Sequence, residues 1–91
     1  MGKNSMMKMI DCKTAIKIVK EYFNQREDII ITQVYDAENM WVVFTSTLGK
    51  ENIPRFDSIR LAVDKMSGKI DSFYLPDRKN FDLLKSAKKV F

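Results

Sequence analysis

The sequence predicts an α+β domain: an N-terminal helix packed on a four-stranded antiparallel sheet, followed by a C-terminal helix. Two observations support this order. Amphipathic segments lie at both ends of the chain, and short β-branched and aromatic runs separated by turn residues lie between them. The 91 residues are 45% hydrophobic, which suits one packed core, and the chain is too short for two domains. We therefore expect a flexible leader at residues 1–9 and a single domain at residues 10–91.

The first helix is predicted by apolar residues that recur at spacings of three and four after Asp11. These residues are Cys12, Ala15, Ile16, Val19, Tyr22 and Phe23. Lysines occupy the opposite side, as expected for the solvent face of an amphipathic helix. We expect the carboxylate of Asp11 to cap the first turn by accepting hydrogen bonds from its free amides.

Four strands are predicted between the helices. Residues 29–35 and 40–47 are rich in β-branched and aromatic residues and flank a turn-forming segment, so they predict a hairpin. The second of these strands is apolar on both faces, which indicates a central strand covered on each side. Residues 57–63 alternate between apolar and polar, and a turn with Gly68 at its positive-φ position leads to a fourth strand at residues 70–75.

Two remaining segments connect and complete these elements. Residues 48–56 contain a glycine and a proline and show no clear period, which predicts a connecting loop. The last segment has apolar residues at helical spacing up to Phe91 and begins at a capping residue, Asp77 or Asn80. We expect this helix to dock on the same sheet face as the first helix or at an edge of the sheet.

The composition excludes several chemistries. With no histidine and one cysteine, the chain has no His-based triad, no Cys–His pair, no zinc site of the usual nitrogen and sulfur ligands and no internal disulfide. Cys12 is expected in the first helical turn, where the dipole lowers a thiol pKa, but no histidine is present to act as its base. We interpret it as a small core residue, and we expect a protein without enzymatic activity, metal or cofactor.

No export or membrane segment is predicted. Lysines stand at positions 3 and 8 and no apolar run follows them, unlike in a secretory signal. The longest uninterrupted apolar stretch, residues 40–44, is far shorter than the roughly 20 residues that a membrane helix needs. We therefore expect a cytoplasmic protein.

Three stretches together resemble a family of small bacterial proteins. They are TAIKIVKEYF at residues 14–23, MWVVF at residues 40–44 and LAVDKMSGKI at residues 61–70. This layout resembles the YrhB-like immunity proteins, the immunity protein 35 family, over roughly residues 12–75. The hairpin in the third stretch is also similar to that of PepSY-like domains. The resemblance implies one helix packed across an antiparallel sheet, binding and neutralisation of a cognate toxin or inhibition of an enzyme, and no catalytic motif.

The net charge of +4 hides an uneven distribution along the chain. Residues 1–26 carry six basic and two acidic residues, residues 27–57 carry two and six, and residues 58–91 carry eight and four. If the tip of the first hairpin and the 48–56 loop lie at one end of the sheet, their acidic residues would face a basic partner, such as the active cleft of a nuclease toxin. The predicted partner-binding residues are Asp36, Glu38, Gly49, Lys50, Glu51, Asn52 and Arg55. The alternative is that aspartate serves only local hydrogen bonding in these turns.

Two other functions remain open. The lysine-rich helix faces are an alternative phosphate-binding surface for nucleic acid, formed by Lys13, Lys17, Lys20, Lys85, Lys88 and Lys89. The same lysines also fit the ordinary solvent faces of amphipathic helices, which is the interpretation we favour. The second alternative is a self-associating, PepSY-like inhibitory module whose sheet edge pairs with itself or with a peptide, so that the chain is a monomer or a homodimer.

Overall fold

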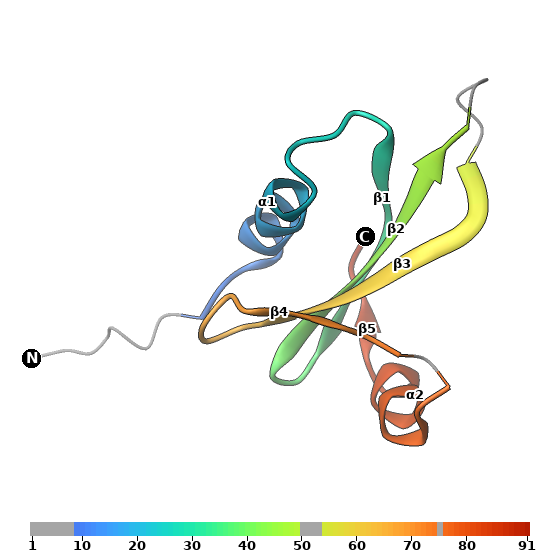
Figure 1. Cartoon of the computed structure of the whole chain (residues 1–91). Coiled ribbons are helices and arrows are strands. Elements are labelled where there is room, and N and C mark those ends of the chain that lie inside the picture. The colour runs from blue at the N-terminus through green and yellow to red at the C-terminus, as the bar shows by residue number, and fades with distance from the viewer. Residues whose placement is uncertain (1–8, 50–53, 75) are drawn as a thin grey trace, which may run out of the picture.

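The computed structural model describes residues 9–49, 54–74 and 76–91, without the side chains of residues 54–58; the predicted leader lies outside this description up to residue 8. The helices are α1 (Cys12–Tyr22) and α2 (Arg78–Lys85). The strands are β1 (Ile29–Ala37), β2 (Met40–Leu48), β3 (Pro54–Asp64), β4 (Ile70–Ser72) and β5 (Lys88–Lys89). In the described part of the chain they form an antiparallel sheet in the order β4-β3-β2-β1-β5 (Figure 1). The predicted α+β fold is confirmed.

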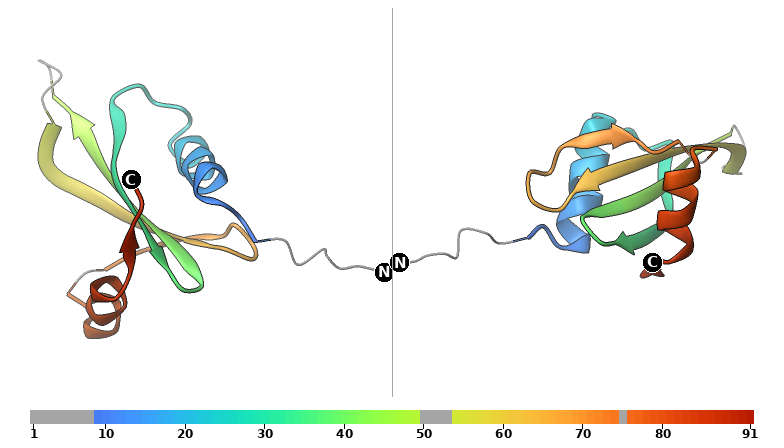
Figure 2. Two further views of the ribbon diagram at one scale, coloured as in Figure 1. Left: turned by 180° about the vertical axis from the view of Figure 1, so that it is seen from behind. Right: turned by 90° about the horizontal axis from the view of Figure 1, so that it is seen from below.

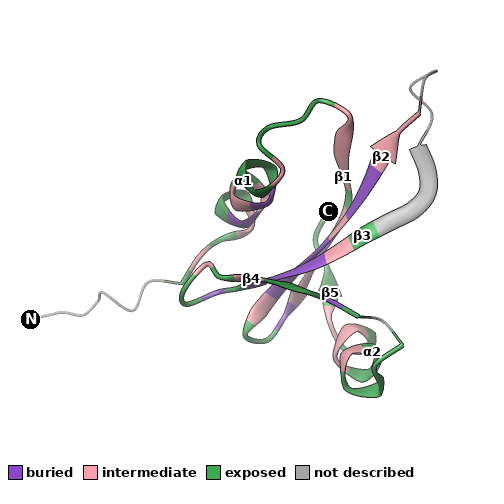
Figure 3. Ribbon diagram, in the orientation of Figure 1, coloured by how far each residue is buried: buried purple, intermediate pink, exposed green. Residues whose placement is uncertain are grey.

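The two helices cover opposite faces of the sheet (Figure 2). Ala15 and Val19 of α1 pack on one face, in a core that includes Val43 of β2. The neighbouring Val42 points to the other face, where Leu83 of α2 packs against a second core. The buried residues accordingly follow the central strands (Figure 3). The expectation that the last helix docks on the same face or at an edge is wrong, because β2 is apolar on both faces and each face needs a cover.

The C-terminal helix is shorter than predicted, and the chain after it forms a fifth strand. α2 ends at Lys85, and β5 pairs antiparallel with residues 35–36 of β1. The contact continues at Val90, whose amide donates to the carbonyl of Val34 at 2.9 Å. The helix expected up to Phe91 is therefore wrong beyond Lys85, because the open backbone edge of β1 accepts these residues as a strand.

Two strand boundaries also differ from the prediction. β3 begins at Pro54, which pairs with Leu48 at the end of β2, so the connection is shorter than the expected 48–56 loop. A proline is tolerated as the first residue of a strand, where its missing amide costs little. β4 ends at Ser72 rather than at residue 75, and the chain then turns toward α2.

The chain enters α1 through hydrogen bonds to the sheet. The amide of Ile10 donates to the carbonyl of Lys65 at 2.8 Å, and Nε1 of Trp41 donates to the carbonyl of Ile10 at 2.7 Å. Asp11 caps α1 as predicted, since its Oδ1 accepts from the amide of Thr14 at 2.8 Å. These contacts hold the start of α1 beside the turn between β3 and β4.

The turn between β3 and β4 requires a glycine for two reasons. Gly68 has a φ of 77°, the positive value predicted for it, which residues with a Cβ rarely adopt. A Cβ at this position would also lie 3.1 Å from Cδ1 of Ile10 and 3.3 Å from Cδ1 of Ile18. The turn therefore packs closely against the segment that leads into α1 and against α1 itself.

We predict that Val90→Pro opens the pairing between β1 and the C-terminal segment, because proline has no amide to donate to the carbonyl of Val34. Hydrogen exchange followed by NMR should then show faster exchange of the Val34 amide, which donates to the carbonyl of Phe91 at 3.4 Å. Val90→Thr keeps the amide and a β-branched side chain, so it should leave this exchange rate unchanged. Equal protection of Val34 in both variants would contradict the pairing.

Candidate functional site

Two turns of the sheet meet at one end of the molecule. The turn between β1 and β2 holds Glu38 and Asn39, and the carbonyl of Asn39 accepts from the amide of Lys65 at 3.0 Å. Lys65 begins the turn between β3 and β4, at whose base the amide of Asp64 donates to the carbonyl of Lys69 at 2.9 Å. Antiparallel pairing thus brings acidic residues from both turns to the same end of the sheet.

The predicted partner-binding residues do not come together. Asp36 and Glu38 lie at this end, whereas Gly49 follows β2 at the other end. The nine residues of β2 separate the two ends by roughly 27 Å, at about 3.3 Å per residue. The premise that the hairpin tip and the 48–56 loop share one end is wrong, because they are the turns at opposite ends of one strand. Four of the predicted residues have no described side chain, namely Lys50, Glu51, Asn52 and Arg55; the first three lie outside the described residues altogether.

Asp36 is committed to an interaction inside the protein. Its carboxylate pairs with Nζ of Lys65, a lysine that is only 8% exposed. The same Nζ lies 4.6 Å from the centroid of the Trp41 ring, within the range of a cation–π interaction. A buried ammonium without a counter-charge is costly, so Asp36 stabilises the fold instead of facing a partner.

The two sets of predicted phosphate-binding lysines lie apart. The first set is exposed on α1 and consists of Lys13, Lys17 and Lys20. Lys85 ends α2 on the other face of the sheet, and Lys88 and Lys89 are exposed in β5 at its edge. Because α1 and α2 cover different faces, the sheet separates the two sets, and a nucleic acid would not follow both along one surface.

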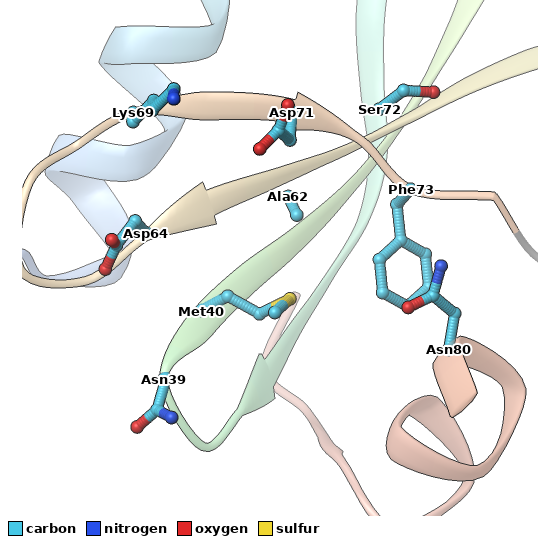
Figure 4. A pocket seen from close by; sticks show the side chains of 9 residues that line it. All are labelled: Asn39, Met40, Ala62, Asp64, Lys69, Asp71, Ser72, Phe73 and Asn80. Atoms are coloured by element: carbon cyan, nitrogen blue, oxygen red, sulfur yellow. The ribbon is translucent and has the colours of Figure 1, made fainter.

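A hollow of about 300 Å³ opens beside the two turns, on the sheet face that α2 covers (Figure 4). Met40, Ala62 and Phe73 supply its apolar floor. Ala62 lies between Val42 of β2 and Asp71 of β4. Its side chain is a single methyl group, which leaves space above the sheet at this position. α2 stands on the Phe73 side and leaves the side toward the turns open. The polar residues that line the hollow are Asn39, Asp64, Lys69, Asp71, Ser72 and Asn80.

The two carboxylates of the hollow differ in what they already bind. Asp64 accepts from the amide of Met66 at 2.9 Å and from the hydroxyl of Ser67 at 3.1 Å, and these hydrogen bonds hold the pKa of Asp64 below its usual value. Asp71 is exposed, and no hydrogen bond or ion pair with another described residue engages its carboxylate. In Figure 4 this carboxylate points from β4 toward the hollow. Asp64 therefore stabilises its turn, whereas Asp71 is available to a ligand.

Sequence reasoning missed this hollow, although one signal points toward it. Asp64 and Asp71 belong to residues 58–91, a stretch whose excess of basic residues conceals them. The alternation of β3 does place Ala62 and Asp64 on one face, opposite to Leu61 and Val63. The hollow remains open because α2 crosses this sheet face beside it. Local sequence patterns do not predict the position of α2 on the sheet.

The described residues offer little for metal or thiol chemistry. Within residues 9–49, 54–74 and 76–91, no three His, Cys, Asp or Glu residues are grouped so that they could hold a metal ion. Burial raises the pKa of the Cys12 thiol, and the carboxylates of Asp11 and Asp36 raise it further. No helix in the same residues has the length and apolarity needed to cross a membrane.

We predict that Asp36→Asn and Lys65→Met each lower the free energy of unfolding by about 1–2 kcal/mol, because each leaves the remaining group without its charge partner. The double variant should lose less than the sum of the two single losses, since the pair is then removed as a unit. Urea unfolding followed by circular dichroism measures all four proteins. Strictly additive losses would show that the two groups are not coupled.

We also predict that Asp64→Asn weakens the acid sensitivity of the fold. The folded-state pKa of Asp64 is depressed, so its contribution to stability is complete above the unfolded pKa of about 3.9 and is lost as the pH falls through the folded pKa. Thermal unfolding between about pH 6 and pH 2 should therefore show a steeper loss in the wild type than in Asp64→Asn. Ser67→Ala removes one of the two hydrogen bonds and should fall between them. Parallel curves for all three proteins would rule out this role.

Comparisons with known proteins do not assign the chain to a family. No protein-family model matches it, and no curated protein or solved structure matches it significantly. The similarity to immunity proteins accordingly stays an expectation from the sequence. We therefore infer the function from the geometry and the charges of the hollow.

Proposed function

We propose that this chain is a small, non-enzymatic protein that binds a basic protein partner through the acidic end of its sheet. The acidic end consists of the two adjoining turns and the residues Glu38, Asp64 and Asp71. Most specifically, we propose an immunity-type protein of the bacterial cytoplasm that binds and neutralises a cognate toxin or enzyme. The observation that carries the proposal is the solvent-open hollow with the uncommitted carboxylate of Asp71 at its rim.

The charge of the acidic end supports a basic partner. Glu38, Asp64 and Asp71 belong to this end, Lys65 is already paired with Asp36, and Lys69 is the lysine that lines the hollow. Complementary charge across an interface speeds association and disfavours partners of the same sign. A toxin that acts on nucleic acid carries a basic cleft, which is the surface that such an end would cover.

An exposed aromatic residue adjoins the hollow and enlarges the proposed interface. Tyr74 is 66% exposed and Phe81 is 55% exposed. The carbonyl of Tyr74 accepts from Nδ2 of Asn80, a residue that lines the hollow, and Phe81 follows Asn80 in α2. Aromatic residues are enriched among those that contribute most to binding at protein interfaces. We therefore include Tyr74 in the proposed surface, whereas Phe81 borders a separate hollow with Arg78 and Lys85.

The geometry favours binding over hydrolysis. A pair of carboxylates can act as general acid and general base only when one of them has a raised pKa and stays protonated. In this hollow the pKa of Asp64 is lowered, and its two oxygens are held by the turn. Asp64 is therefore unsuited to act as the protonated acid of such a pair.

Co-expression with the protein encoded next to this chain in its native genome tests the proposal. We expect the chain to relieve the growth arrest that its neighbour causes and to co-elute with it in gel filtration. Asp71→Lys should weaken the complex at least tenfold, because it places a cation at the rim that faces the basic partner. Glu21→Lys makes the same charge change on α1, on the opposite side of the sheet, and should leave the affinity unchanged. Absence of a complex, or equal affinity of both variants, would refute the proposal.

A further inference from the structure

We propose that the hollow binds the side chain of an arginine that the partner presents, with Asp71 as its ion-pair partner. This inference rests on the proposed function, because it names the group by which the partner is held. Three features of the hollow carry it, namely its size and apolar floor, the uncommitted Asp71 carboxylate as an acceptor, and the balance of charge among the lining residues.

The floor suits the methylene stem of a long side chain. Met40 and Ala62 provide apolar contact below the rim, and Phe73 closes the side toward α2 (Figure 4). A volume of about 300 Å³ lies at the small end of ligand sites, so one side chain fits better than a cofactor. Arginine buries its aliphatic stem along apolar surface and keeps its charged head at a polar rim, which is the arrangement that this hollow offers.

The uncommitted carboxylate of the hollow is a pure acceptor, while Asn39, Lys69 and Ser72 place donors in the same lining. Both oxygens of Asp71 are without a partner among the described residues. Nδ2 of Asn80 donates one of its two hydrogens to the carbonyl of Tyr74 at 2.9 Å, so Oδ1 and the second N–H remain for a ligand. Asp64 also lines the hollow, but its two oxygens already accept from Met66 and Ser67 of its own turn. A group that pairs with the Asp71 carboxylate must supply donors, and a guanidinium carries five N–H donors and no acceptor.

The charges around the hollow favour a cation and, among cations, a guanidinium. Lys69 lies across the β3–β4 ladder from Asp64, at the turn end, while Asp71 lies two residues further along β4. Among the residues that line the hollow, two carboxylates stand against one ammonium, which favours a cation over an anion. A planar guanidinium can pair with the Asp71 carboxylate through two parallel hydrogen bonds and still reach a further acceptor, whereas a lysine ammonium binds as a point charge.

A titration of the full chain with short peptides tests the inference by NMR. The probe is acetyl-Gly-Arg-Gly-amide, and the matched controls are the same peptide with citrulline or with lysine in place of arginine. We expect saturable shifts of the backbone amides of Ala62, Asp71 and Phe73 with a dissociation constant in the millimolar range. Citrulline, which is neutral and similar in shape, should bind at least tenfold more weakly, and lysine should bind several-fold more weakly.

Two variants assign the binding to the hollow. Asp71→Asn keeps the size of an exposed side chain, so the spectrum should retain its dispersion while the affinity for the arginine peptide falls at least tenfold. Glu21→Gln removes a carboxylate on the opposite side of the sheet and should not change the affinity. Equal binding of the arginine, lysine and citrulline peptides, or unchanged binding to Asp71→Asn, would overturn the inference.

The outcomes also separate this inference from the proposed function. If the arginine peptide fails to bind while the complex with the neighbouring protein remains sensitive to Asp71→Lys, the arginine assignment is wrong and the proposed function stands. If the peptide binds as expected but the chain forms no complex with that protein, the arginine site stands and the proposed function is wrong.

Discussion

The architecture of this protein depends on one buried ammonium. Nζ of Lys65 pairs with Asp36 of β1 and lies over the ring of Trp41 in β2, so one side chain joins the ends of three strands. Removing a lysine from water is costly, and this position is stable only while both partners are in place. The backbone of Lys65 forms two further hydrogen bonds at this end of the sheet. Its amide donates to the carbonyl of Asn39, and its carbonyl accepts from the amide of Ile10. Adjacent turns and the entry to α1 are thereby joined at one end of the sheet.

The same interaction decides which acidic groups can reach a partner. It neutralises Asp36 inside the fold and, by joining the two turns, places Asp64 and Asp71 beside the tip of the first hairpin. Asp64 is then used by its own turn, which leaves Asp71 as the uncommitted carboxylate at the rim of the hollow. Structural and binding roles are therefore divided among carboxylates that look equivalent in the sequence.

Local patterns predicted most elements because each depends on neighbours in the chain. Helical spacing and the cap at Asp11 predicted α1, alternation predicted β3, and the need for a positive φ predicted Gly68. Local patterns did not predict the fifth strand, β5. It is two residues long, too short to show a period of two, and Val90 and Phe91 fit helical spacing equally well. The residues become a strand because β1 offers them an open edge, which is a contact between distant segments.

Residue order alone establishes the α+β class, the apolar character of β2 on both faces and the absence of histidine chemistry, since these follow from composition and from periods within single elements. The candidate site followed only from the folded chain. Strand pairing joins residues far apart in sequence, so it separated the hairpin tip from the 48–56 loop and set Asp71 beside Ala62 and Asn80. Charge summed along the chain cannot show this, because Asp64 and Asp71 belong to a basic stretch and join Glu38 at an acidic end only when the two turns meet in the folded chain.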